Sequence, residues 1–330
     1  MIISWNTTNK CNMRCKHCYR NAGLEVEGEL NTSEAKKLIE DIKKAGFKIM
    51  IFSGGEPLMR KDIFELIEHA AKCKLRPVLG SNGTLITRET ALKLKAAGTM
   101  GIGISLDSLD SNKHNEFRGL NTGWQDTIKG IENCREVGLG FQVHTTVMDW
   151  NFKEILDITD FAVKMRAVAH HIFFIVPTGR AQNIQHEFLN APQYEELLTN
   201  IVNKQKEVSI EIKPTCAPQF MRIAKQKGVP YRFSKGCIAG ISYCIINTKG
   251  DVQPCAYLDI CVDNVRSKPF YEIWKNNSVL RELRTLNYKG KCGICTYKNL
   301  CGGCRARAAF YNNGDYMAEE SLCIYEERGQ

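Results

Sequence analysis

The stretch IISWNTTNKCNMRCKHC, residues 2–18, joins a short apolar run to three closely spaced cysteines. The run at 2–5 has the length and composition of a buried β-strand, and the polar residues after it are typical of a loop. Cys11, Cys15 and Cys18 lie in that loop. Thiolates are soft ligands that suit zinc or iron–sulfur clusters. The stretch therefore predicts a metal centre directly after the first strand.

Length and composition indicate a globular protein with a substantial core. The chain has 330 residues, 43% of them hydrophobic. No apolar run approaches the roughly 20 residues of a membrane span, and the first residues lack the pattern of a signal peptide. We therefore expect a cytoplasmic protein without a membrane span. In that reducing compartment, the fifteen cysteines argue against a disulfide framework and for metal binding.

The net charge of +9 and the pI of about 8.8 favour an acidic partner. Nucleic acid is one candidate, and a small molecule that carries carboxylates or phosphates is another. The Lys and Arg residues are scattered along the chain rather than clustered, which is typical of an ordinary solvated surface. We therefore expect no nucleic-acid partner.

Short apolar runs alternate with longer amphipathic stretches from residue 1 to about 176, as in repeated β-α units around a parallel sheet. The predicted strands are 2–5, 48–52, 77–80, 100–106, 141–147 and 171–176. The predicted helices are 32–45, 62–73, 89–97, 124–137 and 152–165. This α/β pattern predicts a partial (β/α)6 TIM-type barrel, in which ligands bind at the carboxyl ends of the strands.

The alternation stops after residue 176. A loop, a helix at 191–208 and a short strand in IEIKPTCAPQ (210–219) follow. From Cys237 onward helical patterns nearly vanish while nine cysteines appear. We predict three parts: a barrel at 1–190, a bridging helix and loop at 191–235, and a cysteine-rich domain at 236–330.

Three thiolates without a nearby fourth cysteine favour a cubane cluster over zinc, because zinc sites usually supply four ligands in two close pairs. His17 is the one nearby candidate for a fourth ligand, and the loop would have to bend sharply to bring it round. The trio therefore suggests a [4Fe-4S] cluster whose fourth iron is open to a substrate or cofactor.

The spacing C-x3-C-x2-C after a first strand resembles the signature of radical S-adenosylmethionine enzymes. The resemblance implies that a cluster on Cys11, Cys15 and Cys18 binds S-adenosylmethionine through its amino and carboxylate groups. It also implies that electron transfer from the cluster cleaves the C–S bond to a 5′-deoxyadenosyl radical.

Motifs at the ends of later predicted strands support the resemblance. SGGEP (53–57) resembles the family motif that binds the methionyl ammonium, so Gly54, Gly55, Glu56 and Pro57 are implied cofactor contacts. Paired glycines permit close backbone approach, and a glutamate supplies an anion for a cation. SNGT (81–84) and GISLDS (103–108) similarly imply that Asn82 and Ser105 contact the ribose and carboxylate.

The later cysteines resemble the SPASM extension of radical enzymes, in which GDVQPC (250–255) precedes the C-x2-C-x5-C block CGICTYKNLC (292–301). The resemblance implies one auxiliary [4Fe-4S] cluster on Cys237, Cys244, Cys255 and Cys304. It implies another on Cys292, Cys295, Cys301 and Cys323. In the common SPASM form, three residues separate the C-x2-C-x5-C block from the cysteine that follows it, whereas this chain has two between Cys301 and Cys304. The number of auxiliary clusters, one or two, therefore stays open. A pair of structural zinc sites is the alternative.

Several other residues have a functional and a structural interpretation. Cys216 and Cys261 are spare, although either is able to replace a cluster ligand. Arg118 meets either a carboxylate or a helix terminus, and His144 is either a core residue or faces the barrel interior. Cys73 and Cys134 are predicted to be buried small apolar residues.

Across nearly its full length the chain resembles the haem-biosynthesis branch of this family, the NirJ-type proteins and the Ahb enzymes. The resemblance implies radical removal of carboxylate-bearing side chains from an iron tetrapyrrole, by propionate decarboxylation or acetate loss. A ferredoxin or flavodoxin is the expected electron donor. One rival is a peptide maturase with the same architecture. Such maturases usually carry a leader-binding segment ahead of the trio, and the ten residues before Cys11 argue against it. The rival from another class is a zinc-stabilised nucleic-acid-binding protein.

Overall fold

One ten-stranded sheet is the framework of the molecule. The computed structural model describes residues 1–327, with strands in the order β10-β9-β8-β1-β2-β3-β4-β5-β6-β7. The strands are β1 (Ile2–Asn6), β2 (Ile49–Ser53), β3 (Arg76–Ser81), β4 (Gly101–Ser105), β5 (Phe141–Val147), β6 (Ala169–Phe174), β7 (Glu211–Thr215), β8 (Tyr243–Ile246), β9 (Asp251–Gln253) and β10 (Asp263–Asn264). From β1 to β7 each strand pairs in parallel with the next. Their carboxyl ends therefore meet at one edge of the curved sheet.

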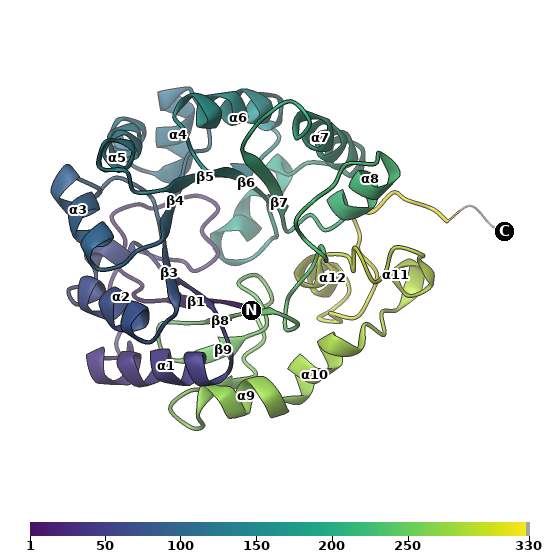
Figure 1. The fold of residues 1–330 in the computed structure, drawn as a ribbon. Coiled ribbons are helices and arrows are strands. Elements are labelled where there is room, and N and C mark those ends of the chain that lie inside the picture. Colours follow the sequence, from purple (N-terminus) through teal and green to yellow (C-terminus); the bar gives the residue numbers. More distant parts are fainter. Residues whose placement is uncertain (328–330) are drawn as a thin grey trace.

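Helices cover the outer face of this sheet, as Figure 1 shows. They are α1 (Thr32–Lys44), α2 (Ile63–Lys72), α3 (Arg88–Ala96), α4 (Ser111–Arg118), α5 (Gly123–Val137), α6 (Ile155–Lys164), α7 (Ala191–Lys204) and α8 (Phe220–Gln226), with 3-10 turns η1 (Pro57–Met59), η2 (Phe152–Glu154) and η3 (Gly179–Glu187). Helix α1 begins with a reciprocal capping box between Asn31 and Glu34, which satisfies two otherwise free amides. Within residues 1–327, every helix falls short of the length and apolar character of a membrane span.

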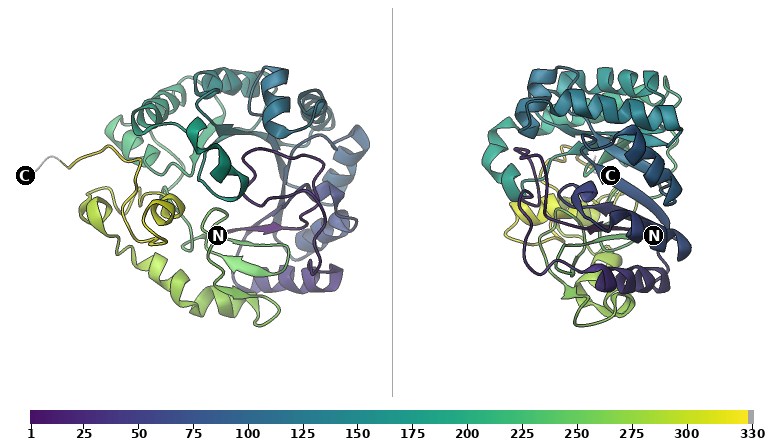
Figure 2. Two further views of the ribbon diagram at one scale, coloured as in Figure 1. Left: turned by 180° about the vertical axis from the view of Figure 1, so that it is seen from behind. Right: turned by 90° about the vertical axis from the view of Figure 1, so that its left-hand side faces the viewer.

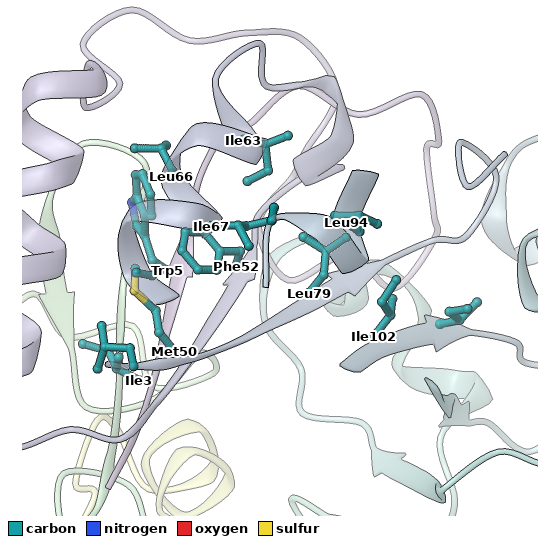
Figure 3. Packing of buried hydrophobic residues seen from close by; sticks show 14 of the residues in the cluster. Ile3, Trp5, Met50, Phe52, Ile63, Leu66, Ile67, Leu79, Leu94 and Ile102 are labelled. Atoms are coloured by element: carbon teal, nitrogen blue, oxygen red, sulfur yellow. The ribbon is translucent and has the colours of Figure 1, made fainter. Parts of the chain in front are cut away.

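The main core lies between the sheet and the outer helices. Trp5, Phe52 and Leu79 point from β1, β2 and β3 toward Leu66 and Ile67 of α2, as Figure 3 shows, and all five are fully buried. Burying each such side chain contributes about 1.5–3 kcal/mol. Because strand side chains alternate, the residues between these face away from the helices. We call that second surface of the sheet the inner face.

The six predicted barrel strands are confirmed, with ends that differ by at most two residues. Helix α4 was not predicted, because its sequence SNKHNEFR lacks a clear apolar stripe. The short strand predicted in 210–219 is β7, and it extends the barrel sheet beyond six strands. The division at 190 and 235 remains a prediction.

The expectation that helices nearly vanish after Cys237 is wrong. Four short helices follow: α9 (Phe270–Asn276), α10 (Ser278–Thr285), α11 (Gly290–Ile294) and α12 (Arg305–Tyr311). Helices of five to eight residues are too short to show a convincing period in sequence. Strand β8 pairs in parallel with β1, so this segment also completes the sheet. In Figures 1 and 2 it lies beside the barrel, next to α8 on one side and α1 on the other.

Arg307 of α12 ties the cysteine-rich segment to the barrel. Its two terminal nitrogens donate to the backbone oxygen of Cys216, just beyond β7, at 3.1 and 2.8 Å. Its charge is balanced by Glu320 at 3.5 Å, and both side chains are at most 1% exposed. Removing this buried cation is strongly destabilising, because the Glu320 carboxylate then lacks its cation and the Cys216 carbonyl lacks its donors.

Replacing Arg307 with Met is therefore expected to lower the free energy of unfolding by about 3–5 kcal/mol. Chemical denaturation of the anaerobically purified protein measures this loss. Arg281→Met is the matched control, because Arg281 is exposed on α10 and its removal should change stability by less than about 0.5 kcal/mol. Equal stability of the two variants would contradict the assigned role of Arg307.

Candidate active site

The cysteine trio lies in the loop between β1 and α1, and several backbone contacts hold that loop. The Cys11 amide donates to the Gly23 oxygen at 2.8 Å, which closes the loop on itself. Arg180 of η3 holds it from outside: its Nε donates to the Cys15 oxygen at 2.8 Å and its Nη1 to the Ala22 oxygen at 2.9 Å. Gly179 is required beside it, since a Cβ there would lie 2.5 Å from the Cys18 oxygen.

The three thiols share one electrostatic environment. Burial, together with the nearby Glu56, Cys15 and Cys18, raises the pKa of Cys11 to about 12. Burial also raises the pKa of Cys15, against the opposing effect of Arg118. The Met13 amide donates to the Cys11 sulfur at 3.5 Å. Bound iron would stabilise the thiolate forms of these cysteines and so offset the cost of deprotonating buried thiols.

His17 is turned away from the trio. Its ring stacks on Phe117 with centroids 4.2 Å apart, and burial lowers its pKa to about 3. The groups that act on it electrostatically are Arg118, Asp107, Arg180 and His114 rather than the thiols. The trio thus offers three protein ligands without His17 as a fourth, and this donor set fits a cubane with one open vertex.

Arg118, at the end of α4, meets both a carboxylate and a thiol. Its Nε donates to Asp107 Oδ2 at 2.6 Å, and its Nη1 lies 3.9 Å from the Cys15 sulfur. Burial alone would raise the pKa of Asp107, but Arg118 outweighs it and holds that pKa low. A buried guanidinium beside Cys15 stabilises negative charge on this sulfur.

Gly54 and Gly55 pack against the chain that leads into the trio. A Cβ on Gly54 would lie 2.5 Å from the Thr8 oxygen, and one on Gly55 would lie 2.3 Å from the Lys10 oxygen. The Gly55 amide donates to Thr8 and the Glu56 amide to Lys10. Within residues 1–327, no hydrogen bond reaches the carbonyl oxygen of either glycine. Two free carbonyls beside Cys11 suit the ammonium of S-adenosylmethionine.

Glu56 organises the strand ends from inside the protein. It is fully buried, and its carboxylate accepts from the Asn82 amide at 2.8 Å, Ser81 Oγ at 2.9 Å and the Leu58 amide at 3.2 Å. Burial raises its pKa to about 7, which these hydrogen bonds oppose. This carboxyl group directly follows the two glycines, and its oxygens are occupied by protein donors. Pro57 begins the 3-10 turn that follows.

Asn82 and Ser105 lie at the carboxyl ends of β3 and β4, on the side of the trio. Asn82 Nδ2 donates to Asn12 Oδ1, inside the trio loop, at 2.8 Å. Ser105 is half-buried and its Oγ is 3.5 Å from the Ser81 oxygen. Asn82 therefore contacts the trio loop directly, whereas Ser105 lies one strand further along and contacts the end of β3.

The later cysteines fall into two groups, and Cys244 joins neither. Cys237, Cys255 and Cys304 act on one another electrostatically. Cys304 also interacts with Cys216, and this neighbour together with Arg307 lowers the pKa of Cys304. By contrast, Cys244 in β8 is fully buried in the apolar core, and Arg284 is the charged group that acts on its thiol.

The second group lines a cavity of about 280 Å³. Its cysteines are Cys292, Cys295, Cys301 and Cys323. The backbone amides of Glu320, Tyr297 and Gly303 donate to Cys292, Cys295 and Cys301 at 3.4–3.5 Å, and Arg305 Nη2 lies 3.8 Å from Cys292. Amides and a guanidinium aimed at sulfur stabilise thiolates, and four thiols around a cavity fit a complete cubane.

Three contributors were missed or left open by sequence reasoning. Cys216 was counted as spare, because its closeness to Cys304 arises only in the folded chain. Arg180 gave no signal beyond its place in the loop after the sixth strand. For Arg118, the carboxylate interpretation is correct and Cys15 is an additional neighbour. Cys261 is exposed, and Cys134 is a buried core residue as predicted.

Comparisons with known proteins agree with this site. Residues 5–162 match the model of the radical SAM superfamily, and residues 237–305 match SPASM, an iron–sulfur cluster-binding domain. This second match supports iron–sulfur clusters over the zinc alternative. The fold is similar to that of Streptococcus suis SuiB bound to S-adenosylmethionine, with a TM-score of 0.78 and 19% identity over 98% of this chain and 77% of that one.

Among curated proteins, the chain is 44% identical to an AdoMet-dependent heme synthase of Nitratidesulfovibrio vulgaris, over 99% of this chain and 93% of the relative. It is 41% identical to an AdoMet-dependent heme synthase of Methanosarcina barkeri, over 98% and 96%. A Fe-coproporphyrin III synthase of the same archaeon is 29% identical over 98% and 90%. With [4Fe-4S] clusters and S-adenosylmethionine as its cofactors, the chain belongs to the haem-biosynthesis branch of the radical SAM superfamily.

Proposed function

We propose that this enzyme is a haem synthase that converts propionates of an iron coproporphyrin to vinyl groups. The observation that carries the proposal is its identity of 44% to a heme synthase, over almost the whole of both chains. The Fe-coproporphyrin III synthase, by name the enzyme that makes such a compound, is less similar at 29%. Propionate decarboxylation is therefore favoured over acetate removal.

The reaction defines what the protein must provide. A propionate that loses one hydrogen atom, carbon dioxide and one electron becomes a vinyl group. The bound cluster and S-adenosylmethionine supply a radical able to remove the hydrogen atom. The chain itself must hold those cofactors, place the propionate beside them, exclude water and accept the electron that is left.

The residues at the carboxyl ends of β1–β4 are the proposed cofactor site. Cys11, Cys15 and Cys18 would hold the cluster, and the Gly54 and Gly55 carbonyls would accept from the ammonium of S-adenosylmethionine. Glu56 fixes these strand ends and adds its field from within. Asn82 and Ser105 are proposed to contact the ribose and carboxylate of the same cofactor.

The electron released with carbon dioxide requires an acceptor, and the auxiliary clusters fit this role. We assign one to Cys292, Cys295, Cys301 and Cys323, the four cysteines around the cavity. To the other auxiliary cluster we assign Cys216, Cys237, Cys255 and Cys304, with Cys216 as a ligand in place of Cys244. Tyr19, next to Cys18, packs on Tyr257 with ring centroids 5.2 Å apart. Cys255 lies near enough to both tyrosines to contribute to raising their pKa. This auxiliary site therefore adjoins the trio loop.

The remaining partners are proposed by chemistry. An iron tetrapyrrole is the substrate, and a ferredoxin or flavodoxin would supply the low-potential electron that starts each turnover. We place the reaction in the cytoplasm, where thiolate ligands and such donors stay reduced.

Anaerobic incubation of the reconstituted enzyme with S-adenosylmethionine, a reductant and iron coproporphyrin III tests the activity. Each conversion should lower the substrate mass by carbon dioxide plus two hydrogen atoms, and 5′-deoxyadenosine should form alongside. Cys15→Ala is the control that should abolish both products. Loss of acetate from didecarboxysirohaem, with coproporphyrin left unchanged, would instead make the enzyme a deacetylase. Turnover of a peptide alone would support the maturase alternative.

The Cys216 assignment predicts different metal contents for two alanine variants. Cys216→Ala should lose the iron and sulfide of one auxiliary cluster, or leave it with an altered electron paramagnetic resonance spectrum. Cys244→Ala should keep the full iron content, since this thiol lies in the apolar core. The opposite result, with Cys244→Ala short of iron and Cys216→Ala complete, would restore the ligand set implied by sequence resemblance.

A further inference from the structure

Four polar side chains form a row across the inner face of the sheet. The register places Ser105 of β4 beside His144 of β5, His144 beside His171 of β6, and His171 beside Lys213 of β7. All four are half-buried, whereas their strand neighbours are buried in the outer core, for example Ile104, Val143, Ile172 and Ile212. The row therefore crosses the surface that faces away from the helices.

The middle of the row is fixed by packing. The rings of His144 and His171 stack with centroids 5.1 Å apart and planes 6° apart. Gly103 of β4 makes room for the first ring, because a Cβ there would lie 2.1 Å from His144 Cε1. His144 Nε2 lies 3.2 Å from Gln142 Oε1. Burial lowers the pKa of both histidines, so their imidazoles are neutral and able to donate one N–H each.

Lys213 ends the row with a charge that the protein does not neutralise. Its ammonium lies 4.1 Å from the centre of the Phe233 ring. In the part of the chain that the structure describes, no carboxylate forms an ion pair with it, and Glu211 of the same strand and the Cys216 thiol act on it without a direct contact. A half-buried ammonium without an anion is costly, because partial desolvation is not compensated. Such a group favours an incoming anion.

The two ends of the row adjoin the two kinds of cluster site. Ser105 lies with the strand ends that adjoin the trio, and Cys216 follows Lys213 by three residues. Three strand spacings of about 4.8 Å separate β4 from β7, so the row spans roughly 14 Å. A ligand on it would lie between the radical site and the auxiliary site.

We propose that Lys213, with His171 beside it on β6, binds a carboxylate of the tetrapyrrole substrate. The inference rests on the proposed function and adds to it the group that anchors the substrate. An ammonium and neutral imidazole N–H groups are suitable donors for a carboxylate, and a charge-assisted hydrogen bond is stronger than a neutral one. Anchoring one carboxylate at β7 would place the macrocycle over β5 and β6, toward Ser105.

Binding to the reconstituted holoenzyme tests this anchor. Iron coproporphyrin III is titrated anaerobically into wild type, Lys213→Gln and Lys213→Arg, and the porphyrin absorption band is followed. Lys213→Gln should bind at least tenfold more weakly, while Lys213→Arg keeps the charge and recovers much of the affinity. The matched control is Lys227→Gln, which removes an exposed lysine after α8 and should bind as wild type.

An esterified probe separates charge recognition from structural damage. The tetramethyl ester of the same iron porphyrin has no carboxylate, so wild type and Lys213→Gln should bind it equally. His171→Gln provides an independent test at the neighbouring position and should weaken binding of the free acid severalfold. Lys213→Gln should fold normally, because an unpaired cation is removed.

The outcomes distinguish the inference from the function it extends. If wild type and Lys213→Gln bind the free acid equally well, the anchor is wrong and the haem synthase proposal stands. A difference that persists with the ester also overturns the anchor, because the carboxylate is then not what Lys213 recognises. If wild type binds no porphyrin at all, the proposed function fails and takes the anchor with it.

Discussion

The close approach of two backbone segments is the constraint on which the site depends. Gly54 and Gly55 lie so near residues 8–10 that no side chain fits between them, and paired amides lock the contact. Because residue 11 is the first cysteine of the trio, this contact sets where the cluster loop starts. Glu56, directly after the glycines, then fixes the end of β3 through Asn82 and Ser81. One short segment thus aligns three strand ends around one ligand.

The framework was predictable from the sequence, and the ligand sets were predictable only in part. Strands β1 to β6 are short apolar runs between clear turn signals, so their pattern is local. Helix α4 and helices α9–α12 are short or polar, and tertiary contacts rather than periodicity stabilise them. The trio is closely spaced in sequence, and the group around the cavity was implied by the resemblance to the SPASM extension. Cys216 is distant in sequence from Cys304, and its place beside it depends on how α12 docks against β7.

Several arginines are buried and balanced within the molecule. Arg118, Arg305 and Arg307 are each at most 8% exposed and lie near cysteine sulfurs or their carboxylate partners. Thiolate-ligated clusters carry net negative charge, and guanidinium groups in the protein interior offset it. Sequence alone suggested an acidic partner for the positive charge of the chain. Arg118 and Arg307 are instead balanced inside the molecule by Asp107 and Glu320, and Lys213 on the inner face is the cation that we propose meets a ligand.

The pairing of β1 with β8 has a consequence for how the chain is made. β1 is synthesised long before β8, so one of its edges has no partner until residues 243–246 are made. At 5–20 residues per second that delay is roughly 10–50 s. Throughout it, an apolar strand keeps a free edge, which is a template for aggregation. Closure of this edge of the sheet therefore waits for the cysteine-rich segment, which links the completion of the barrel to the folding of that segment.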